Sequence, residues 1–148
     1  MNEKSTTDLL NIFDDISPAD IDSFINENSN ILPNKNIFFE YMSSNNISAA
    51  SVVNACNGYI SKSYVYDILS GNKTNPSRDI VLVLCIALHM NKKMTRRLLE
   101  NYNHRDLYLK DPRDIIIATY INTEIYNIDE INDELSKYSL PLFATNTQ

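Results

Sequence analysis

The chain has 148 residues, of which 43% are apolar, so it can form one domain, with or without an appendage, around a real core. Its two cysteines lie inside helical patterns without metal-ligand spacing, so neither a disulfide framework nor a metal site is expected. Residues 1–15 contain acids and no apolar run of signal-peptide length, and no segment approaches the length of a membrane span. We therefore expect a cytoplasmic protein without membrane contact.

The net charge of −6 is unevenly distributed along the chain. Residues 1–36 carry two lysines and seven acids, and residues 106–148 carry three basic residues and eight acids, so each segment has a net charge of −5. Residues 37–105 carry eight basic residues and four acids, a net charge of +4. A basic face on the central segment can still bind phosphate groups, although a protein with a net negative charge attracts DNA more weakly at long range. These three segments are the expected parts of the chain: an acidic N-terminal helical arm with a linker, a central body and a C-terminal helical extension.

Two amphipathic pieces are expected in the N-terminal arm. The first covers 7–13, and the second begins at Ser17, a favourable N-cap followed by Pro18 at the first helical position. The stretch 26–36 is rich in Asn and contains a proline, which predicts a linker.

The central body is predicted to hold five helices. Gly58 and Gly71 are the only glycines, and each falls where a helical pattern stops, as expected of residues with left-handed backbone at helix C-termini. The N-caps are expected at Ser48, Ser61, Ser77 and Asn91. The helices are expected over 37–43, 49–57, 62–70, 78–88 and 92–103. The fourth is apolar nearly all round and should be central in the domain.

Two more helices are expected in the C-terminal extension. Asp111 as N-cap and Pro112 as first helical residue predict a helix over the apolar run 115–121, although this β-branched run is also compatible with a strand. Asn127 is the expected cap of the last helix. The tail from Ser139 onward should be extended.

The helices over 49–57 and 62–70, with Gly58 between them, have the layout of a helix-turn-helix DNA reader. In that motif the first helix packs against the second and supports it, and the second enters the major groove with its N-terminal end toward the bases. Apolar residues of the second helix are spaced to pack inward, which turns its polar residues outward. The candidate DNA-binding residues are Ser48, Ser61, Lys62, Ser63, Tyr64, Tyr66, Asp67, Ser70, Lys73 and Arg78.

These candidates have different expected roles. Lys62 and its two serine neighbours would contact bases, and the two tyrosines would bond phosphate or stack on sugar. Asp67 would repel phosphate unless it accepts from a cytosine amino group. Lys73 and Arg78 flank the following loop and would clamp the phosphate backbone. The alternative is a solvated polar face on an ordinary helical bundle.

Residues 61–77 resemble the Cro/C1-type helix-turn-helix domains, the Xre family. That family commonly ends its recognition helix with a glycine, then a basic residue, and opens the next helix with Asn-Pro-Ser; this chain has Gly71, Lys73 and the run Asn75-Pro76-Ser77. The resemblance covers about 37–103. It implies an all-α, five-helix, lambda-repressor-like body that binds duplex DNA sequence-specifically in a bacterium or its mobile elements, and it adds Asn75 to the candidates. The segment 107–114 and the helices after it look like an extension seen in one group of Firmicutes regulators.

The chain also departs from the family at the helix starts. Family members usually place Gln there, in contact with phosphate and bases, where this chain has Ala49, Ala50 and Lys62. Ala49 therefore occupies a candidate contact position without the family's side chain. The missing Gln, Asp67 on the reading face and the acidic flanks favour a second hypothesis, a protein-interaction adaptor that keeps the fold without binding DNA.

No enzyme is expected. His89 and His104 lack partners at metal spacing, and the acid pair Asp129-Glu130 points to different faces of a helix. Two separated glycines cannot form a phosphate-binding loop. We therefore expect no catalytic residue, metal or cofactor.

The leading hypothesis is a transcriptional regulator that binds double-stranded DNA as a homodimer, because one helix reads too few base pairs for useful specificity. The acidic terminal segments are candidates for dimerisation or for contact with a protein partner. The last two helices carry more apolar surface than a five-helix body needs, and Tyr120, Tyr126 and Tyr138 on them are candidate interface residues.

Overall fold

The computed structural model describes residues 17–21 and 37–146 of the chain. It divides into two compact units, Met1–Lys35 and Asn36–Gln148. In the first unit the described residues form one 3-10 turn, η1 (Pro18–Asp20). Ser17 precedes it as predicted, and the Asp20 carboxylate accepts hydrogen bonds from the Ser17 backbone N–H (3.2 Å) and hydroxyl (3.0 Å). The helix expected over 7–13, the rest of the second piece and the expected linker lie outside the described residues.

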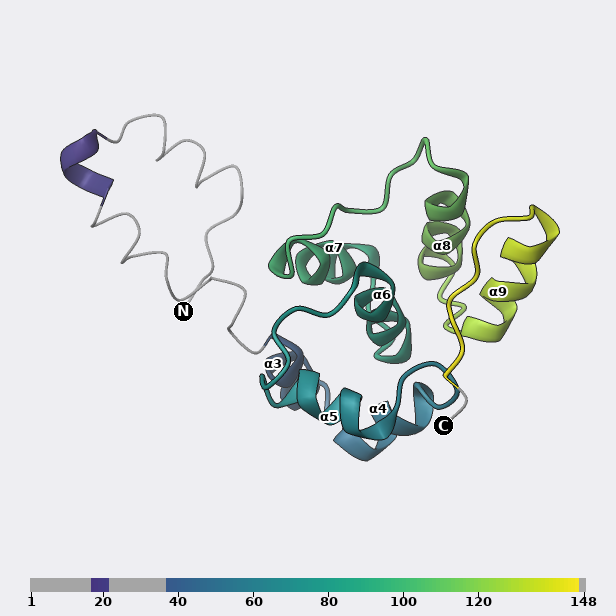
Figure 1. The fold of residues 1–148 in the computed structure, drawn as a ribbon, viewed down its shortest axis with the longest axis horizontal. Helices are drawn as coiled ribbons and strands as arrows, with labels where there is room; N and C mark the ends of the chain where they lie inside the picture. Colours follow the sequence, from purple (N-terminus) through teal and green to yellow (C-terminus); the bar gives the residue numbers. More distant parts are fainter. Residues whose placement is uncertain (1–16, 22–36, 147–148) are drawn as a thin grey trace. The chain divides into compact units, whose positions relative to one another are not determined.

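The second unit is all-helical over residues 37–146, with no strand in that range. Its helices are α3 (Ile37–Ser44), α4 (Ala49–Ala55), α5 (Lys62–Leu69), α6 (Arg78–Ala87), α7 (Lys92–Asn101), α8 (Pro112–Asn122) and α9 (Ile128–Lys137) (Figure 1). The seven helices expected in this part of the chain are confirmed. The β-branched run 115–121 is helical because Asp111 and Pro112 start a helix there: the Asp111 carboxylate accepts from the N–H groups of Arg113 (2.9 Å) and Asp114 (3.4 Å).

Six of the seven predicted N-caps act as expected, whereas the Ser17 hydroxyl donates to Asp20 and accepts no backbone N–H. In each of the six, the side-chain oxygen accepts a hydrogen bond from a backbone N–H in the first turn, which satisfies one of the donors that a helix start leaves unpaired. These caps are Ser48, Ser61, Ser77, Asn91, Asp111 and Asn127.

Each of the seven helices is followed within three residues by a residue with positive φ. Gly58 (φ 90°) and Gly71 (φ 85°) fill this role after α4 and α5, as predicted. The other five are not glycines: Asn46, His89, Asn103, Glu124 and Ser139, with φ between 54° and 61°. After each of these five, a backbone N–H reaches the carbonyl five residues back, such as Met90 to Cys85 at 3.0 Å. This is the Schellman closure, which satisfies the carbonyls left over at a helix end.

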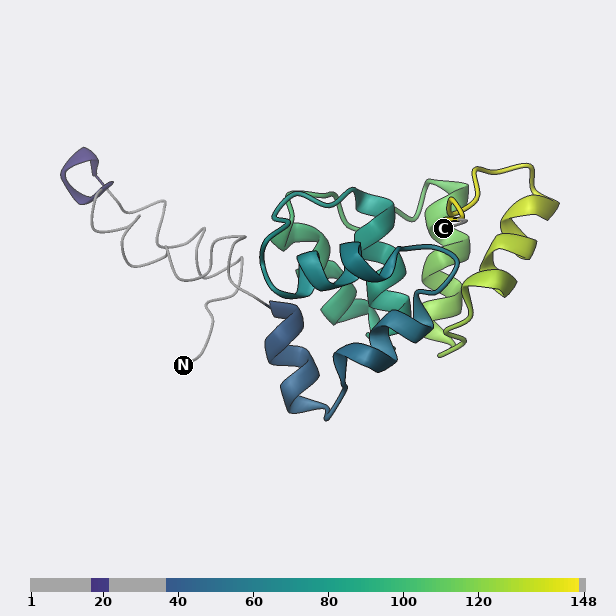
Figure 2. The same ribbon diagram turned by 60° about the horizontal axis from the view of Figure 1, so that its bottom comes forward.

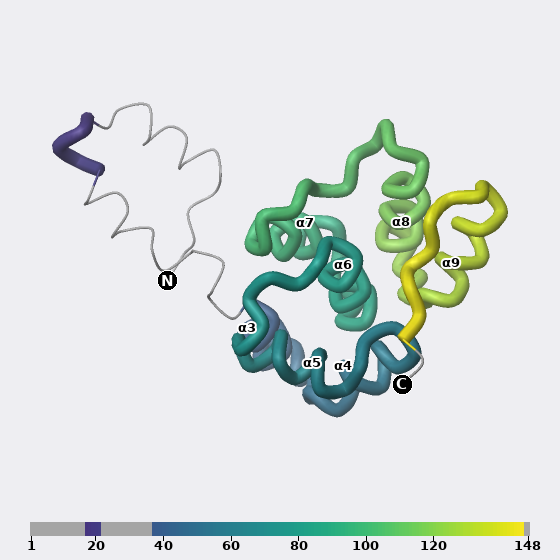
Figure 3. Tube along the Cα trace, in the orientation of Figure 1, coloured from purple at the N-terminus to yellow at the C-terminus, as the bar shows by residue number. Residues whose placement is uncertain are grey.

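The core is built around α6, whose residues 81–86 are all buried. Figures 1 and 3 show α6 in the middle of the helices, with α8 and α9 side by side. One apolar cluster extends from Phe38 on α3 to Phe143 in the tail, and it includes Ile117 on α8 and Ile131 on α9. The predicted central body and the predicted extension therefore share a core. None of the described helices is long and apolar enough to cross a membrane.

Candidate nucleic-acid interface

Helices α4 and α5 are joined by a short turn (Figure 2). Gly58, with φ 90°, lies in this turn. Val52 of α4 and Val65 of α5 are both buried. Ile68 and Leu69 are buried as well, so the inward face of α5 is the predicted one. This packing turns the polar side of α5 toward solvent.

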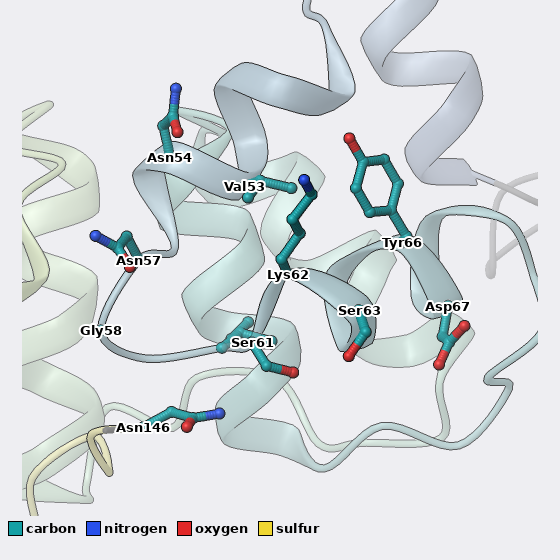
Figure 4. Close-up of a pocket in the computed structure, with 11 residues that line it drawn as sticks. Val53, Asn54, Asn57, Gly58, Ser61, Lys62, Ser63, Tyr66, Asp67 and Asn146 are labelled. Carbon is teal, nitrogen blue, oxygen red and sulfur yellow. The ribbon is translucent and has the colours of Figure 1, made fainter. Parts of the chain in front are cut away.

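An open groove of about 840 Å³ runs along the junction of α4 and α5 (Figure 4). It is lined by five of the candidate DNA-binding residues: Ser61, Lys62, Ser63, Tyr66 and Asp67. Figure 4 shows the Lys62 side chain extending between Val53 of α4 and Tyr66 of α5, while Ser63 and Asp67 point away from that side. The groove thus presents one cation, one carboxylate and several hydroxyls, and its local charge is balanced.

The remaining candidates lie around the groove without lining it. Ser48 is exposed, and its hydroxyl accepts from the Ser51 N–H (3.1 Å) at the start of α4. Ala49 and Tyr64 are half-buried against the core. Ser70 is exposed and donates to the Asp67 carbonyl (3.3 Å). Lys73 and Asn75 are exposed in the loop between α5 and α6.

Arg78 differs from its expected role as a phosphate clamp. Its guanidinium bonds both oxygens of Asp114, with Nη1–Oδ1 at 3.1 Å and Nη2–Oδ2 at 3.0 Å. It also donates to the carbonyls of Arg105 (3.1 Å) and Asp106 (3.2 Å). These bonds occupy most of its donors, so Arg78 holds α6 to α8 instead of facing a ligand. The spacing of α6 could not reveal this, because the partner lies 36 residues further along the chain.

Helix α7 carries a basic group that the sequence analysis did not single out. Lys92, Lys93 and Arg96 are exposed, and Arg97 is half-buried. Arg96 bonds the Glu100 carboxylate one turn later (3.0 Å). The signal was present in the sequence, since four cations fall within six residues, but these residues lie outside the helix-turn-helix pattern.

The C-terminal tail also reaches the groove, which the sequence did not predict. The backbone N–H of Asn146 donates to the Gly58 carbonyl (2.6 Å), and Asn146 is one of the groove residues. One residue after Gly58, the Tyr59 hydroxyl donates to the Asp129 carboxylate of α9. Burial and the Asp129 bond together raise the pKa of Tyr59 to about 12. The turn between α4 and α5 is therefore held by two parts of the extension.

The histidines and cysteines are in structural positions. His89 stacks on Tyr126, with ring centroids 4.6 Å apart, and His104 Nε2 lies 2.8 Å from the Pro76 carbonyl. Burial raises the pKa of both Cys56 and Cys85 to about 12, so both thiols are protonated at neutral pH. Within residues 17–21 and 37–146, no three His, Cys, Asp or Glu side chains gather as a metal site would require.

Comparisons with protein families, with curated proteins and with solved structures found no match to this chain.

Proposed function

We propose that the chain binds duplex DNA in a sequence-specific manner as a transcriptional regulator, with α5 as the reading helix in the major groove. In this proposal α3 to α7 form a lambda-repressor-like helix-turn-helix body of the Xre type. Lys62 and Ser63 contact base edges, and Lys73 contacts phosphate. Arg78 is left out because Asp114 occupies it.

The observation that carries the proposal is the exposed N-terminal half of α5 along an open groove. Ser61, Lys62 and Ser63 line that groove, and α5 is held against the core by its opposite face. A recognition helix needs this combination, since its first residues must reach base edges while its back remains packed.

A homodimer completes the proposal, because one reading helix provides too little specificity. An apolar surface suited to a second copy lies on the extension, where Ile115, Ile125 and Tyr138 are exposed along a groove between α8 and α9. Tyr120 lines the same groove, whereas Tyr126 is engaged with His89. Sedimentation equilibrium of the unaltered protein tests this element: a monomer at all concentrations contradicts it.

The second candidate is an adaptor that binds a protein partner through the same face. Two observations favour it: Asp67 is an exposed carboxylate that lines the groove, and Ala49 at the start of α4 offers no polar side chain to a phosphate. An adaptor of this kind would bind no duplex even at low salt.

A pair of charge-matched variants separates these possibilities. One variant is Lys62→Glu with Lys73→Glu, beside the groove, and the other is Lys92→Glu with Lys93→Glu, on α7. Both change the net charge equally, so a general electrostatic effect would weaken them alike. Fluorescence anisotropy is measured with a labelled duplex from the region upstream of the coding sequence and with a scrambled duplex, each at low and physiological salt.

DNA reading by α5 predicts that the α5-side variant loses at least ten-fold in affinity and that its salt slope falls by about 1, for the phosphate contact of Lys73 that is removed. The α7 variant should stay within a few-fold of the unaltered protein. The reverse pattern assigns the DNA surface to α7. No binding of either duplex by the unaltered protein at low salt favours the adaptor.

A further inference from the structure

The turn between α4 and α5 leads directly into the end of α5 that carries the proposed base contacts. It runs from Cys56, the C-cap of α4, to Ser61, the N-cap of α5. The N–H groups of Tyr59 and Ile60 both bond the Cys56 carbonyl (2.9 and 3.0 Å), and the Ile60 side chain is buried in the core. Lys62 follows two residues after Ile60. A displacement of this turn therefore moves the residues of α5 that would meet the bases.

The turn is also attached to the C-terminal extension. The Tyr59 hydroxyl donates to the Asp129 carboxylate in the first turn of α9, 70 residues further along the chain. A hydrogen bond to a charged acceptor is stronger than one between neutral groups. Ile131, two residues after this carboxylate, is fully buried, so the start of α9 is fixed in the core. The tail adds a second attachment, from the Asn146 backbone N–H to the Gly58 carbonyl.

The bond between Tyr59 and Asp129 is not needed to satisfy a buried polar group. Tyr59 is half-buried and Asp129 is exposed, so water could hydrogen-bond both groups in its place. What the bond adds is a fixed distance between the first turn of α9 and the turn that precedes α5.

We propose that Tyr59 is a positioning residue for DNA reading, and that its bond to Asp129 holds α5 where Lys62 and Ser63 reach base edges. This inference rests on the proposed function. Contacts to base edges require placement within about 0.5 Å, because they read the pattern of donors and acceptors in the groove. Phosphate contacts fix orientation without reading sequence, and flexible lysines make them over a wider range of positions. The extension thereby sets specificity without touching DNA.

Four variants of the two bonded residues test the proposal. Tyr59→Phe removes the hydroxyl without a change of net charge, Asp129→Ala removes its acceptor, and the double variant removes both. Asp129→Asn makes the same charge change as Asp129→Ala but keeps an oxygen that can accept from Tyr59. Tyr108→Phe is the control, because it removes the hydroxyl of an exposed tyrosine in the loop before α8.

The quantity to measure is the specificity ratio, the affinity for the upstream duplex divided by the affinity for a scrambled duplex. Fluorescence anisotropy gives both affinities at one fixed salt concentration, and circular dichroism checks that each variant keeps its helical content. A variant that only destabilises the fold lowers the fraction of binding-competent protein. Both affinities then fall alike, and the ratio does not change. A change of charge at position 129 also acts on both duplexes through their phosphates.

A positioning role predicts that Tyr59→Phe and Asp129→Ala each lower the specificity ratio by about 5-fold or more, since a displaced helix loses at least one base contact. The double variant should lose no more than either single variant, because all three remove the same bond. Asp129→Asn and Tyr108→Phe should stay within about two-fold of the unaltered protein. The salt slope of Tyr59→Phe should be unchanged, because no phosphate contact is removed.

Two results would overturn this inference while the proposed function stands: a specificity ratio of Tyr59→Phe equal to that of the unaltered protein, or a loss in Asp129→Asn as large as that in Asp129→Ala. If the unaltered protein binds no duplex even at low salt, or binds both duplexes equally, the proposed function is wrong and this inference is wrong with it.

Discussion

Arg78 and Asp114 form a bidentate ion pair that joins the first turn of α6 to the first turn of α8. The Asp114 side chain is 1% exposed, and one of its oxygens also accepts the Tyr108 N–H (2.9 Å). The Arg78 side chain is 17% exposed. The pair is thus largely removed from water, and most of its donors and acceptors are hydrogen-bonded, which is the condition under which a buried ion pair tolerates its desolvation.

Removing one partner of this pair should destabilise the protein strongly. Arg78→Met leaves the buried Asp114 carboxylate with only the exposed Arg105 guanidinium as a cation, at 3.6 Å, and we expect the free energy of unfolding to fall by about 3 kcal/mol. Urea titration at neutral pH measures it. Arg96→Met is the matched control, since Arg96 pairs with Glu100 at the surface, and it should cost less than about 1 kcal/mol. Equal costs for the two variants would contradict this view of the Arg78 pair.

Glycine at a left-handed helix end should stabilise the fold. Ser139 follows α9 with φ 55° and is exposed, so its side chain pays a steric cost that glycine avoids. We expect Ser139→Gly to raise the free energy of unfolding by about 0.5–1 kcal/mol.

The control for that substitution is the same change three residues earlier. Ser136 lies inside α9, where glycine lowers helix stability by about 0.5–1 kcal/mol. Thermal unfolding of the two variants should therefore shift in opposite directions. Two shifts of the same sign would show that the backbone at Ser139 is not strained.

The helices were predictable because their signals are local. A cap residue, an apolar stripe and a glycine stop each act within one or two turns, so Ser61, Val65 and Gly71 suffice to place α5. The helix ends at Glu124 and Ser139 carry no such signal, because neither residue type favours left-handed backbone by itself. There the Schellman bonds and the packing of the next segment impose the conformation.

Of the groove, the sequence predicted only which side of α5 faces outward. The side of α5 that faces out follows from its apolar spacing, so Lys62 and Ser63 were placed correctly on the surface. The capture of Arg78 by Asp114 and the return of Asn146 to Gly58 join residues far apart in sequence. No periodicity encodes such contacts, because they depend on how complete helices pack together.

The two cysteine thiols should be unreactive in the folded protein. Cys56 and Cys85 are fully buried, and burial raises the pKa of each thiol to about 12. Only the thiolate attacks disulfide reagents, so reaction with a chromogenic disulfide at pH 8 should proceed only through opening of the structure. Both thiols should react rapidly once urea unfolds the chain. Stoichiometric labelling within seconds of mixing with the native protein would contradict the buried placement.

The hydrogen bond from Tyr59 to Asp129 should make stability fall at alkaline pH. Burial and this bond raise the pKa of Tyr59 from 10.0 to about 12, so folding favours the protonated hydroxyl. The unfolded chain then releases its proton first as pH rises above about 10, and the stabilisation is lost progressively between pH 10 and 12. Tyr59→Phe should remove the part of the alkaline loss of stability that this hydroxyl causes. It should also lower the free energy of unfolding at neutral pH by up to about 1 kcal/mol.

Tyr66→Phe is the control, because Tyr66 is 41% exposed on α5 and has no such bond to the extension. It should leave both the neutral stability and its pH dependence unchanged. Urea titrations at pH 8 and pH 10.5 measure both variants beside the unaltered protein. The same decline of stability with pH has contributions from three other buried groups whose pKa values are raised to about 12: Cys56, Cys85 and Tyr102. Tyr59→Phe should therefore reduce the loss of stability between pH 8 and pH 10.5 without abolishing it. An unchanged decline in Tyr59→Phe would show that the turn is not held by α9 through this hydroxyl.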